Sequence, residues 1–138
     1  MGWLIDTSVW IAVERRRIDL ADVHAITAQA RIYCSPVNIA EIQTGWELLP
    51  AGPLRHRVAE SLRRMRRLIR VQITQETGVI YGRLFAALER SGRSADFRAN
   101  DLWLAAQAVQ RDFQLLTANP KDFADVPGLK MVAMSLPK

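Results

Sequence analysis

The clearest junction between a strand and a helix in this chain is Trp3-Leu4-Ile5-Asp6-Thr7-Ser8-Val9. Its three apolar residues are typical of a buried strand, and the hydroxyl group of Thr7 or Ser8 can cap a helix that starts there. In parallel α/β sheets, functional sites form outside the carboxyl ends of the strands. Asp6 therefore stands where a functional carboxylate is expected, although aspartate is also common as a plain helix cap.

Short apolar runs alternate with longer helical stretches along the rest of the chain. Further strands are predicted at residues 32–34, 71–73 and 114–117, with an edge strand at 129–132. Helices are predicted at residues 9–14, 20–29, 37–48, 54–70, 75–90 and 101–111, and Asp19, Thr74 and Asn100 are expected to cap three of them. This alternation predicts a single α/β domain over residues 1–138. Its three-layer α/β/α arrangement would place helices on both faces of a mainly parallel sheet of four to five strands.

The composition limits the chemistry that the chain can carry. Its 138 residues are 49% apolar, which is ordinary for one packed domain. A single cysteine, Cys34, excludes an internal disulfide and CxxC-type zinc or redox sites. The two histidines, His24 and His56, form no HExxH motif, and no Walker A, GxGxxG or GxSxG motif is present. Catalysis would therefore rest mainly on carboxylates.

No segment of the sequence resembles a targeting signal or a membrane span. Asp6 and the charged residues 14–17 interrupt the first apolar stretch before it reaches signal-peptide length. No apolar run approaches the ~20 residues of a transmembrane helix. Because the lone cysteine also suits a reducing compartment, we expect a cytoplasmic protein with no membrane partner.

Glu41 is an acidic residue on the predicted inward face of the 37–48 helix. On a helical wheel it lies in the same broad arc as Val37, Gly45 and Leu48. A carboxylate on that face costs several kcal/mol unless it is paired or binds a cation. Glu41 is therefore either half of a buried ion pair with an arginine or a functional carboxylate.

Two more acids follow predicted structural boundaries later in the chain. Asp101 opens a helix that is apolar nearly all round, so we expect the start of this helix to be held rigidly near the sheet. Asp101 is either a functional carboxylate there or a residue that simply complements the helix dipole, worth ~0.3–1 kcal/mol. Asp122 follows the 114–117 strand and the Asn119-Pro120 turn, from which it can return to the sheet edge or cap a turn. Asp96, in the loop before Asp101, is a rival position that we leave out of the site.

These four acids come from four separate elements, and all are expected at one edge of the sheet. Clustered carboxylates repel one another, so they normally share protons or bind a hard cation. Mg²⁺ or Mn²⁺, held by one or two carboxylates and by water, is the expected ion.

The net charge of +5 is concentrated in one predicted helix. Residues 55–70 hold seven arginines against one glutamate, and an apolar stripe from Leu54 to Ile69 recurs at helical spacing. The helix is either a solvated surface or a contact for phosphates or an acidic partner, both of which a planar guanidinium can grip in a bidentate way.

Four segments of the sequence resemble the motifs of PIN-domain ribonucleases, most of all the VapC toxins of bacterial toxin–antitoxin pairs. They are residues 4–9 (LIDTSV), 38–45 (NIAEIQTG), 100–106 (NDLWLAA) and 116–123 (LTANPKDF). The four in this order are fairly specific and span nearly the whole chain. The resemblance implies a three-layer α/β/α fold and a Mg²⁺- or Mn²⁺-dependent endoribonuclease, that is, a hydrolase acting on RNA. It also implies a homodimer and a cognate VapB-type antitoxin that blocks the site.

The same resemblance assigns the site residues. The catalytic residues it implies are Asp6, Glu41, Asp101 and Asp122, and the metal ligands among them are Asp6 and Asp101. The fourth position is open between Asn119 and Asp122; we prefer Asp122, with Asn119 as a weaker contact. Thr7 and Ser8 match small polar positions that can orient Asp6 or a bound water.

Two other functions fit parts of the same pattern. A catalytically silent PIN-like module would keep the fold to bind a protein partner but would not cleave RNA. A phosphatase of the haloacid dehalogenase type also begins with an aspartate at a strand end. That chemistry needs a second aspartate two residues later, where this chain has Ser8, so we rank it low.

Overall fold

The computed structural model describes residues 2–28, 30–93 and 98–137, and a five-stranded sheet in the order β3-β2-β1-β4-β5 runs through it. The strands are β1 (Gly2–Ile5), β2 (Arg31–Cys34), β3 (Ile69–Arg70), β4 (Gln114–Thr117) and β5 (Lys130–Ala133). Each neighbouring pair is parallel. The predicted α/β class with a mainly parallel sheet is confirmed.

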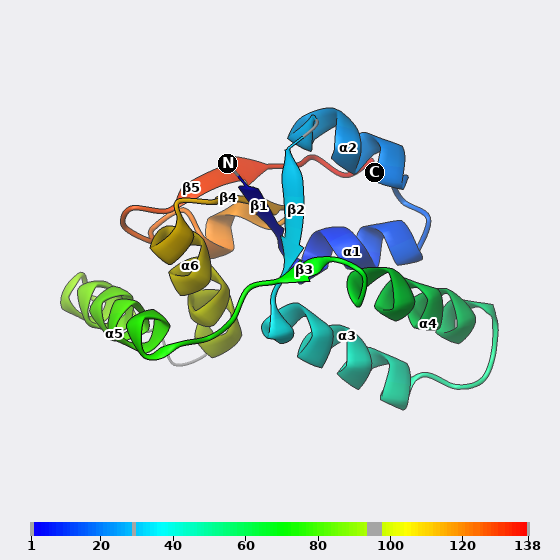
Figure 1. Ribbon diagram of the computed structural model, residues 1–138, viewed down its shortest axis with the longest axis horizontal. Helices are drawn as coiled ribbons and strands as arrows, with labels where there is room; N and C mark the ends of the chain where they lie inside the picture. The colour runs from blue at the N-terminus through cyan, green and yellow to red at the C-terminus, as the bar shows by residue number, and fades with distance from the viewer. Residues whose placement is uncertain (1, 29, 94–97, 138) are drawn as a thin grey trace.

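Helices lie on both sides of this sheet (Figure 1). Their bounds are α1 (Thr7–Glu14), α2 (Leu20–Thr27), α3 (Pro36–Leu48), α4 (Pro53–Met65), α5 (Gln75–Arg90) and α6 (Ala99–Arg111). Helices α1 to α4 pack into one apolar core together with Trp3 and Ile5 of β1, whereas α5 and α6 share a second core with Leu4. Successive side chains of a strand point to opposite faces, so β1 serves both cores and the molecule has three layers.

The predicted boundaries hold to within about two residues except around β3. The basic helix ends at Met65 instead of near residue 70, and β3 lies at Ile69–Arg70 instead of 71–73. Pairing with the end of β2 sets this register, since Ile69 and Arg70 are the partners of Tyr33 and Cys34. The apolar stripe therefore stops at Met65, and Ile69 is 52% exposed.

The capping residues predicted from the sequence are found at two helices, and at a third helix the prediction is wrong. Asp19 and Asp22 form a reciprocal capping box at α2, and Thr74 caps α5. Helix α6 begins at Ala99, with Arg98 and not Asn100 in the N-cap position. No helix in the part of the chain that the structure describes is both long and apolar enough to cross a membrane.

The strand order creates a switch point between β1 and β4. From β1 the chain builds outward through β2 and β3, and it then returns to the other side of β1 for β4 and β5. The segments that follow β1 and β4 therefore leave toward different neighbours, α1 after β1 and the 3₁₀ turn after β4, and open parallel sheets place their sites at the carboxyl ends of the strands at such a switch point. The buried Gln107 holds α6 beside this edge, because its Nε2 donates to Val71 O at 2.8 Å and its Oε1 accepts from Ser35 Oγ.

Candidate active site

Asp6 follows β1 directly and lies between two hydroxyl donors. Its Oδ2 accepts hydrogen bonds from Ser8 Oγ at 2.6 Å and from Thr117 Oγ1 at 2.9 Å. Its backbone N–H donates to Leu116 O at 2.8 Å, which joins the ends of β1 and β4. The residue is only 6% exposed, and a buried carboxylate of this kind requires such donors.

The hydroxyl groups of Thr7 and Ser8 do not cap α1, contrary to the prediction. Asp6 is the N-cap residue, and no side chain there accepts a capping hydrogen bond. Thr7 Oγ1 instead donates to Glu41 Oε1 at 2.8 Å, and Ser8 Oγ is committed to Asp6. Ser8 therefore contacts Asp6, as the family resemblance implies, whereas the side chain of Thr7 contacts Glu41 and not Asp6.

Glu41 lies on α3 and reaches the residues that follow β1. Burial raises the pKa of its carboxyl group, the hydrogen bond from Thr7 lowers it, the neighbouring Asp6 raises it, and a hydrogen bond from Asn100 lowers it. Within the described residues, no arginine forms a salt bridge with Glu41. The alternative of a buried ion pair is therefore not supported, and Glu41 faces other acids.

Asn38 joins the start of α3 to the end of β1 and to Thr7, which in turn contacts Glu41. It is fully buried, and its Nδ2 donates to Ile5 O at 3.0 Å and to Thr7 Oγ1 at 3.1 Å. Its Oδ1 accepts from Ser35 N at 3.1 Å, as part of a capping box at α3. The start of α3 is thus locked onto the end of β1, and this sets the position of the Thr7–Glu41 pair.

Asp101 is the most strongly perturbed acid of the group. Its pKa rises from 3.8 to about 6, mainly because burial penalises the charged form. The charges of Asp6, Asp122 and Glu41 raise it further, while Arg98 lowers it. Asp101 therefore lies within electrostatic reach of all three other acids singled out from the sequence, and the structure brings these four together.

Asp122 lies in a one-turn 3₁₀ helix, Pro120–Asp122, that follows β4. Its backbone N–H donates to Asn119 O at 3.0 Å, and Asn119 N donates to Thr117 Oγ1 at 3.0 Å. Asp122 acts on Asp101 by its charge, whereas Asn119 is exposed. Asp96, the rival in the preceding loop, lies outside the described residues.

A comparison of the sequence with models of known protein families agrees with an acidic site at the carboxyl edge of the sheet. The PIN domain family model covers residues 3–129. This chain belongs to the PIN domain family. The predicted family membership is confirmed, and the acids described above lie at the carboxyl edge of a PIN-domain sheet.

Individual PIN-domain relatives match along almost their full length. The chain is 25% identical to Ribonuclease VapC of Rickettsia bellii over 137 residues, covering 99% of this chain and 98% of the relative. It is 29% identical to Ribonuclease VapC5 of Mycobacterium tuberculosis, covering 94% and 90%. Among solved structures, VapBC2 of Rickettsia felis bound to a promoter DNA fragment superposes with a TM-score of 0.84 at 22% identity, covering 98% of this chain and 100% of that one.

The acids of this PIN domain suit a cation that needs few protein ligands. Within residues 2–28, 30–93 and 98–137, there is no group of three or more Asp, Glu, His or Cys side chains that could hold a metal ion. Mg²⁺ ordinarily takes one or two carboxylates and completes its shell with water. Asp6 and Asp101, which are coupled by charge, supply that number of hard oxygen donors, so the residues fit Mg²⁺ or Mn²⁺.

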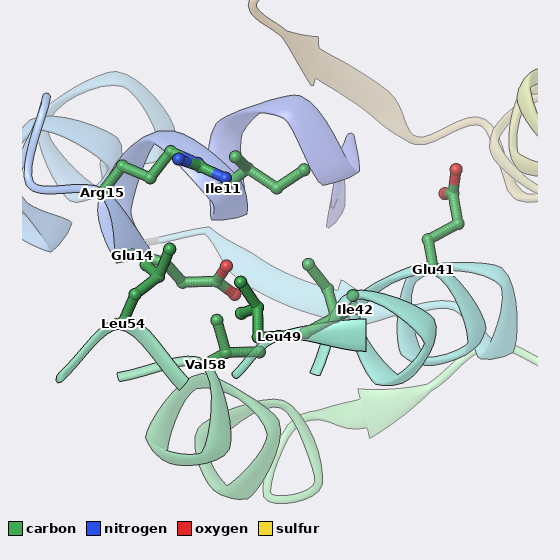
Figure 2. A pocket seen from close by; sticks show the side chains of 9 residues that line it. Ile11, Glu14, Arg15, Glu41, Ile42, Leu49, Leu54 and Val58 are labelled. Atoms are coloured by element: carbon green, nitrogen blue, oxygen red, sulfur yellow. The ribbon is translucent and has the colours of Figure 1, made fainter. Parts of the chain in front are cut away.

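A mostly apolar pocket opens beside Glu41, between α1, α3 and α4 (Figure 2). Glu41 marks one end of it, and Glu14 points into the cluster of apolar side chains at the other. The apolar lining residues are Ile11, Ile42, Leu49, Leu54 and Val58. Glu14 is buried, and its Oε1 has no hydrogen-bond partner, so this PIN domain carries, besides Glu41 and Asp101, a third acid whose pKa burial raises.

Three contributors to the site were not assigned a role from the sequence. Thr117 and Asn38 lie inside the quoted motifs. Each is a polar residue close in sequence to an acidic motif residue, and that proximity is the signal from which a contact with the site could have been predicted. Arg98 reaches Asp125 across 27 positions of the chain, and no local pattern of the sequence reveals such a contact.

Proposed function

We propose that this PIN-domain protein is a metal-dependent endoribonuclease, the toxin of a VapBC-type toxin–antitoxin system. The observation that carries the proposal is the coupling of Asp101 to Asp6, Glu41 and Asp122 at the switch point of the sheet. Full-length relatives that bear the name Ribonuclease VapC support the reaction class. Clustered carboxylates without a nearby histidine or cysteine nucleophile fit hydrolysis assisted by a hard cation.

The residue roles follow from the contacts of the acids. Asp6 and Asp101 would hold Mg²⁺ or Mn²⁺, which supplies a water of lowered pKa and neutralises charge on the phosphate. Glu41 and Asp122 would orient water around the ion, since no three of the described acids are grouped closely enough to hold a metal together. Ser8 and Thr117 keep the Asp6 carboxylate fixed, and Thr7 does the same for Glu41. In the proposed reaction, water attacks phosphorus of an RNA phosphodiester and the bond to the leaving oxygen breaks.

The partners are part of the same proposal. Structures of the VapBC type that share this fold contain a toxin together with its antitoxin, so we propose a cognate VapB-type antitoxin that blocks the acidic site. We also propose that the active form is a homodimer. Since RNA is made and translated in the cytoplasm, the protein would act there.

The alternative is a catalytically silent PIN-like module that only binds a protein partner. Such a module has no need for a cluster of mutually repelling acids, because their repulsion raises the pKa of Asp101 without a benefit to binding. The full set of acids therefore favours the enzyme.

The direct test is cleavage of single-stranded RNA by the purified protein with EDTA, Mg²⁺ or Mn²⁺. Asp6→Ala and Asp101→Ala are each expected to lower the rate by ~10²-fold or more, since even indirect changes near a metal cost ~10–100-fold. Glu47→Ala, which removes an exposed acid from α3, is the control and should leave the rate unchanged. Cleavage in EDTA that survives both aspartate substitutions would contradict the proposal.

A further inference from the structure

One arginine joins the segment after β4 to the start of α6. Arg98 Nη1 donates to Asp125 Oδ2 at 3.0 Å, and Nη2 donates to Asp125 Oδ1 at 2.8 Å. Arg98 Nη2 also donates to the backbone oxygen of Asp122. The two side chains of the ion pair are 18% and 19% exposed. A bidentate pair of this kind fixes geometry, unlike a single contact between two solvated charges.

Helix capping does not explain why an arginine occupies position 98. Arg98 is the N-cap residue of α6, and its side chain makes no capping hydrogen bond. The helix dipole disfavours a cation at this end. The hydrogen-bonded Asp125 raises the pKa of Arg98 most, burial lowers it, and the charges of Asp125, Asp101 and Asp122 raise it further, so three acids compensate this cation.

The guanidinium therefore bridges the two elements that carry half of the candidate site. Asp101 lies in the first turn of α6, and Asp122 closes the 3₁₀ turn after β4. The buried Phe123 holds the turn against the core, but a single 3₁₀ turn is a short element with weak internal bonding. Arg98 adds the link from that turn to α6.

We propose that Arg98, held by Asp125, is a positioning residue that sets the place of Asp122 relative to Asp101. This inference rests on the proposed function, because it concerns how the acids are arranged to share a cation. Misplacing a reacting or binding group by ~1 Å can cost ~10²-fold in rate. The guanidinium also offsets part of the repulsion between Asp101 and Asp122, so the two acids can be held near each other before the ion arrives.

The test compares Arg98→Lys and Asp125→Asn with Arg93→Gln. Arg98→Lys keeps the positive charge but loses the planar fork, and Asp125→Asn removes the anchor and leaves Arg98 in place. Arg93 is the matched control, because it donates to the same Asp125 Oδ2 at 3.2 Å from a side chain that is 65% exposed. The measurements are the Mn²⁺ dissociation constant of the RNA-free protein by titration calorimetry, the melting temperature, and kcat and KM on RNA.

We expect both test variants to bind Mn²⁺ ~10-fold or more weakly and to lose ~10–100-fold in kcat, with KM for RNA nearly unchanged. Arg93→Gln should match the wild type in each quantity. The double variant, Arg98→Lys with Asp125→Asn, should lose no more Mn²⁺ affinity or kcat than the more impaired of the two single variants. Both substitutions break the same contact, so their effects should not add.

Two results would overturn the inference. The first is a pair of folded variants whose Mn²⁺ affinity and kcat match those of Arg93→Gln, which would make Arg98–Asp125 an ordinary ion pair. The second is a loss of activity that follows the melting temperature and disappears on cooling, which would make the link one of stability alone. If the wild type itself neither binds Mn²⁺ nor cleaves RNA, the proposed function fails, and this outcome is distinct from both.

Discussion

Thr117 Oγ1 donates a hydrogen bond of 2.9 Å to Asp6 Oδ2, and the two residues are 111 positions apart in the sequence. Asp6 directly follows β1, and Thr117 is the last residue of β4, so the bond spans the switch point of the sheet. Thr117 Oγ1 also accepts from Asn119 N at 3.0 Å. One hydroxyl group therefore fixes both the carboxylate and the loop that leads to Asp122.

Replacing Thr117 should damage catalysis more than folding. In Thr117→Val the carboxylate of Asp6 loses one of its two hydroxyl donors, and we expect kcat to fall by ~10–100-fold at saturating Mn²⁺. Thr117→Ser keeps the hydroxyl group and should stay within a few-fold of the wild type. Steady-state kinetics on a short RNA, with circular dichroism to check the fold, measures both. A Val variant as active as the Ser variant would show that this bond does not position Asp6.

The acidic cluster should destabilise the metal-free protein at neutral pH. The pKa of Asp101 is raised from 3.8 to about 6 by burial and by three neighbouring acids. At pH values well below 3.8 the group is protonated in both the folded and the unfolded state, so its ionisation does not yet reduce the stability of the folded protein. Between about pH 4 and 6 the unfolded state ionises first, so the stability that Asp101 contributes is lost as pH rises through its folded pKa.

Asp101→Asn should therefore raise the melting temperature of the metal-free protein at pH 7, by ~2–4 °C for each kcal/mol recovered, while it abolishes cleavage. Mn²⁺ should stabilise the wild type, because a ligand that binds only the folded state shifts the equilibrium toward it, and should stabilise the mutant less. Thermal unfolding in EDTA and then in Mn²⁺ tests both points. An Asn variant that melts below the wild type in EDTA, with no effect of Mn²⁺ on either protein, would contradict the clustering of these acids.

The sequence predicted the parts of the fold that depend on local signals. The run Trp3-Leu4-Ile5 before Asp6 indicated β1, and Thr74 indicated the start of α5; the structure has both. Strand β3 was misplaced because Val71 is as apolar as a strand residue and is buried, yet the pairing of Ile69 with Tyr33 in β2 decides the register. A long-range pairing of this kind leaves no mark in the hydrophobic pattern of one segment.

The candidate site also contains residues that local sequence patterns predict and residues that they do not. Asp6 and Glu41 could be singled out from a strand end and from a helical wheel, since each of those patterns is local. Asn100 was expected to cap α6, but the helix begins at Ala99 with Arg98 in the N-cap position, and the side chain of Arg98 bonds to Asp125. The contact of Arg98 is with a partner 27 residues away, and no sequence-spacing rule predicts a contact across a loop.

The arginines of α4 and the following turn are expected to divide between structure and substrate attraction. Arg55 stacks over Trp46 with Cζ 3.9 Å from the ring centroid, and Arg57 Nε donates to Glu14 O at 2.8 Å. Arg63, Arg66 and Arg67 are exposed. Changing these three to Gln should weaken RNA binding and flatten its salt dependence by ~0.7 log units for each phosphate contact that is lost.

The matched control for that triple variant replaces three exposed arginines elsewhere, namely Arg31, Arg83 and Arg90. It removes the same charge, so a nonspecific effect of net charge would appear equally in both. Binding of a fluorescent RNA to a catalytically inactive Asp6→Ala background, measured at several salt concentrations, gives the slopes. Equal slopes for both triple variants would assign the arginines after residue 60 to the solvated surface or to the antitoxin.

Glu14 offers the most direct test of the unusual electrostatics beside the site. Burial raises the pKa of its carboxyl group more than the nearby Ser61 hydroxyl, Arg15 and Arg64 lower it. Its Oε1 is buried without a hydrogen-bond partner at the apolar end of the pocket in Figure 2. Ionising the group in the folded state is therefore costly, and the stability that it contributes at low pH is lost as pH rises from 4.5 through its raised folded pKa.

Glu14→Gln removes the ionisation and keeps the shape, so we expect the variant to melt above the wild type at pH 7. The two proteins should melt together near pH 4, where both side chains are neutral. Glu47→Gln on the exposed surface of α3 is the control and should show no such pH dependence. Thermal unfolding by circular dichroism at pH 4, 5.5 and 7 in EDTA provides the comparison. If Glu14→Gln melts below the wild type at pH 7, the neighbouring arginines stabilise the ionised carboxylate more than burial destabilises it. That result would contradict the expectation that the pKa of Glu14 is raised.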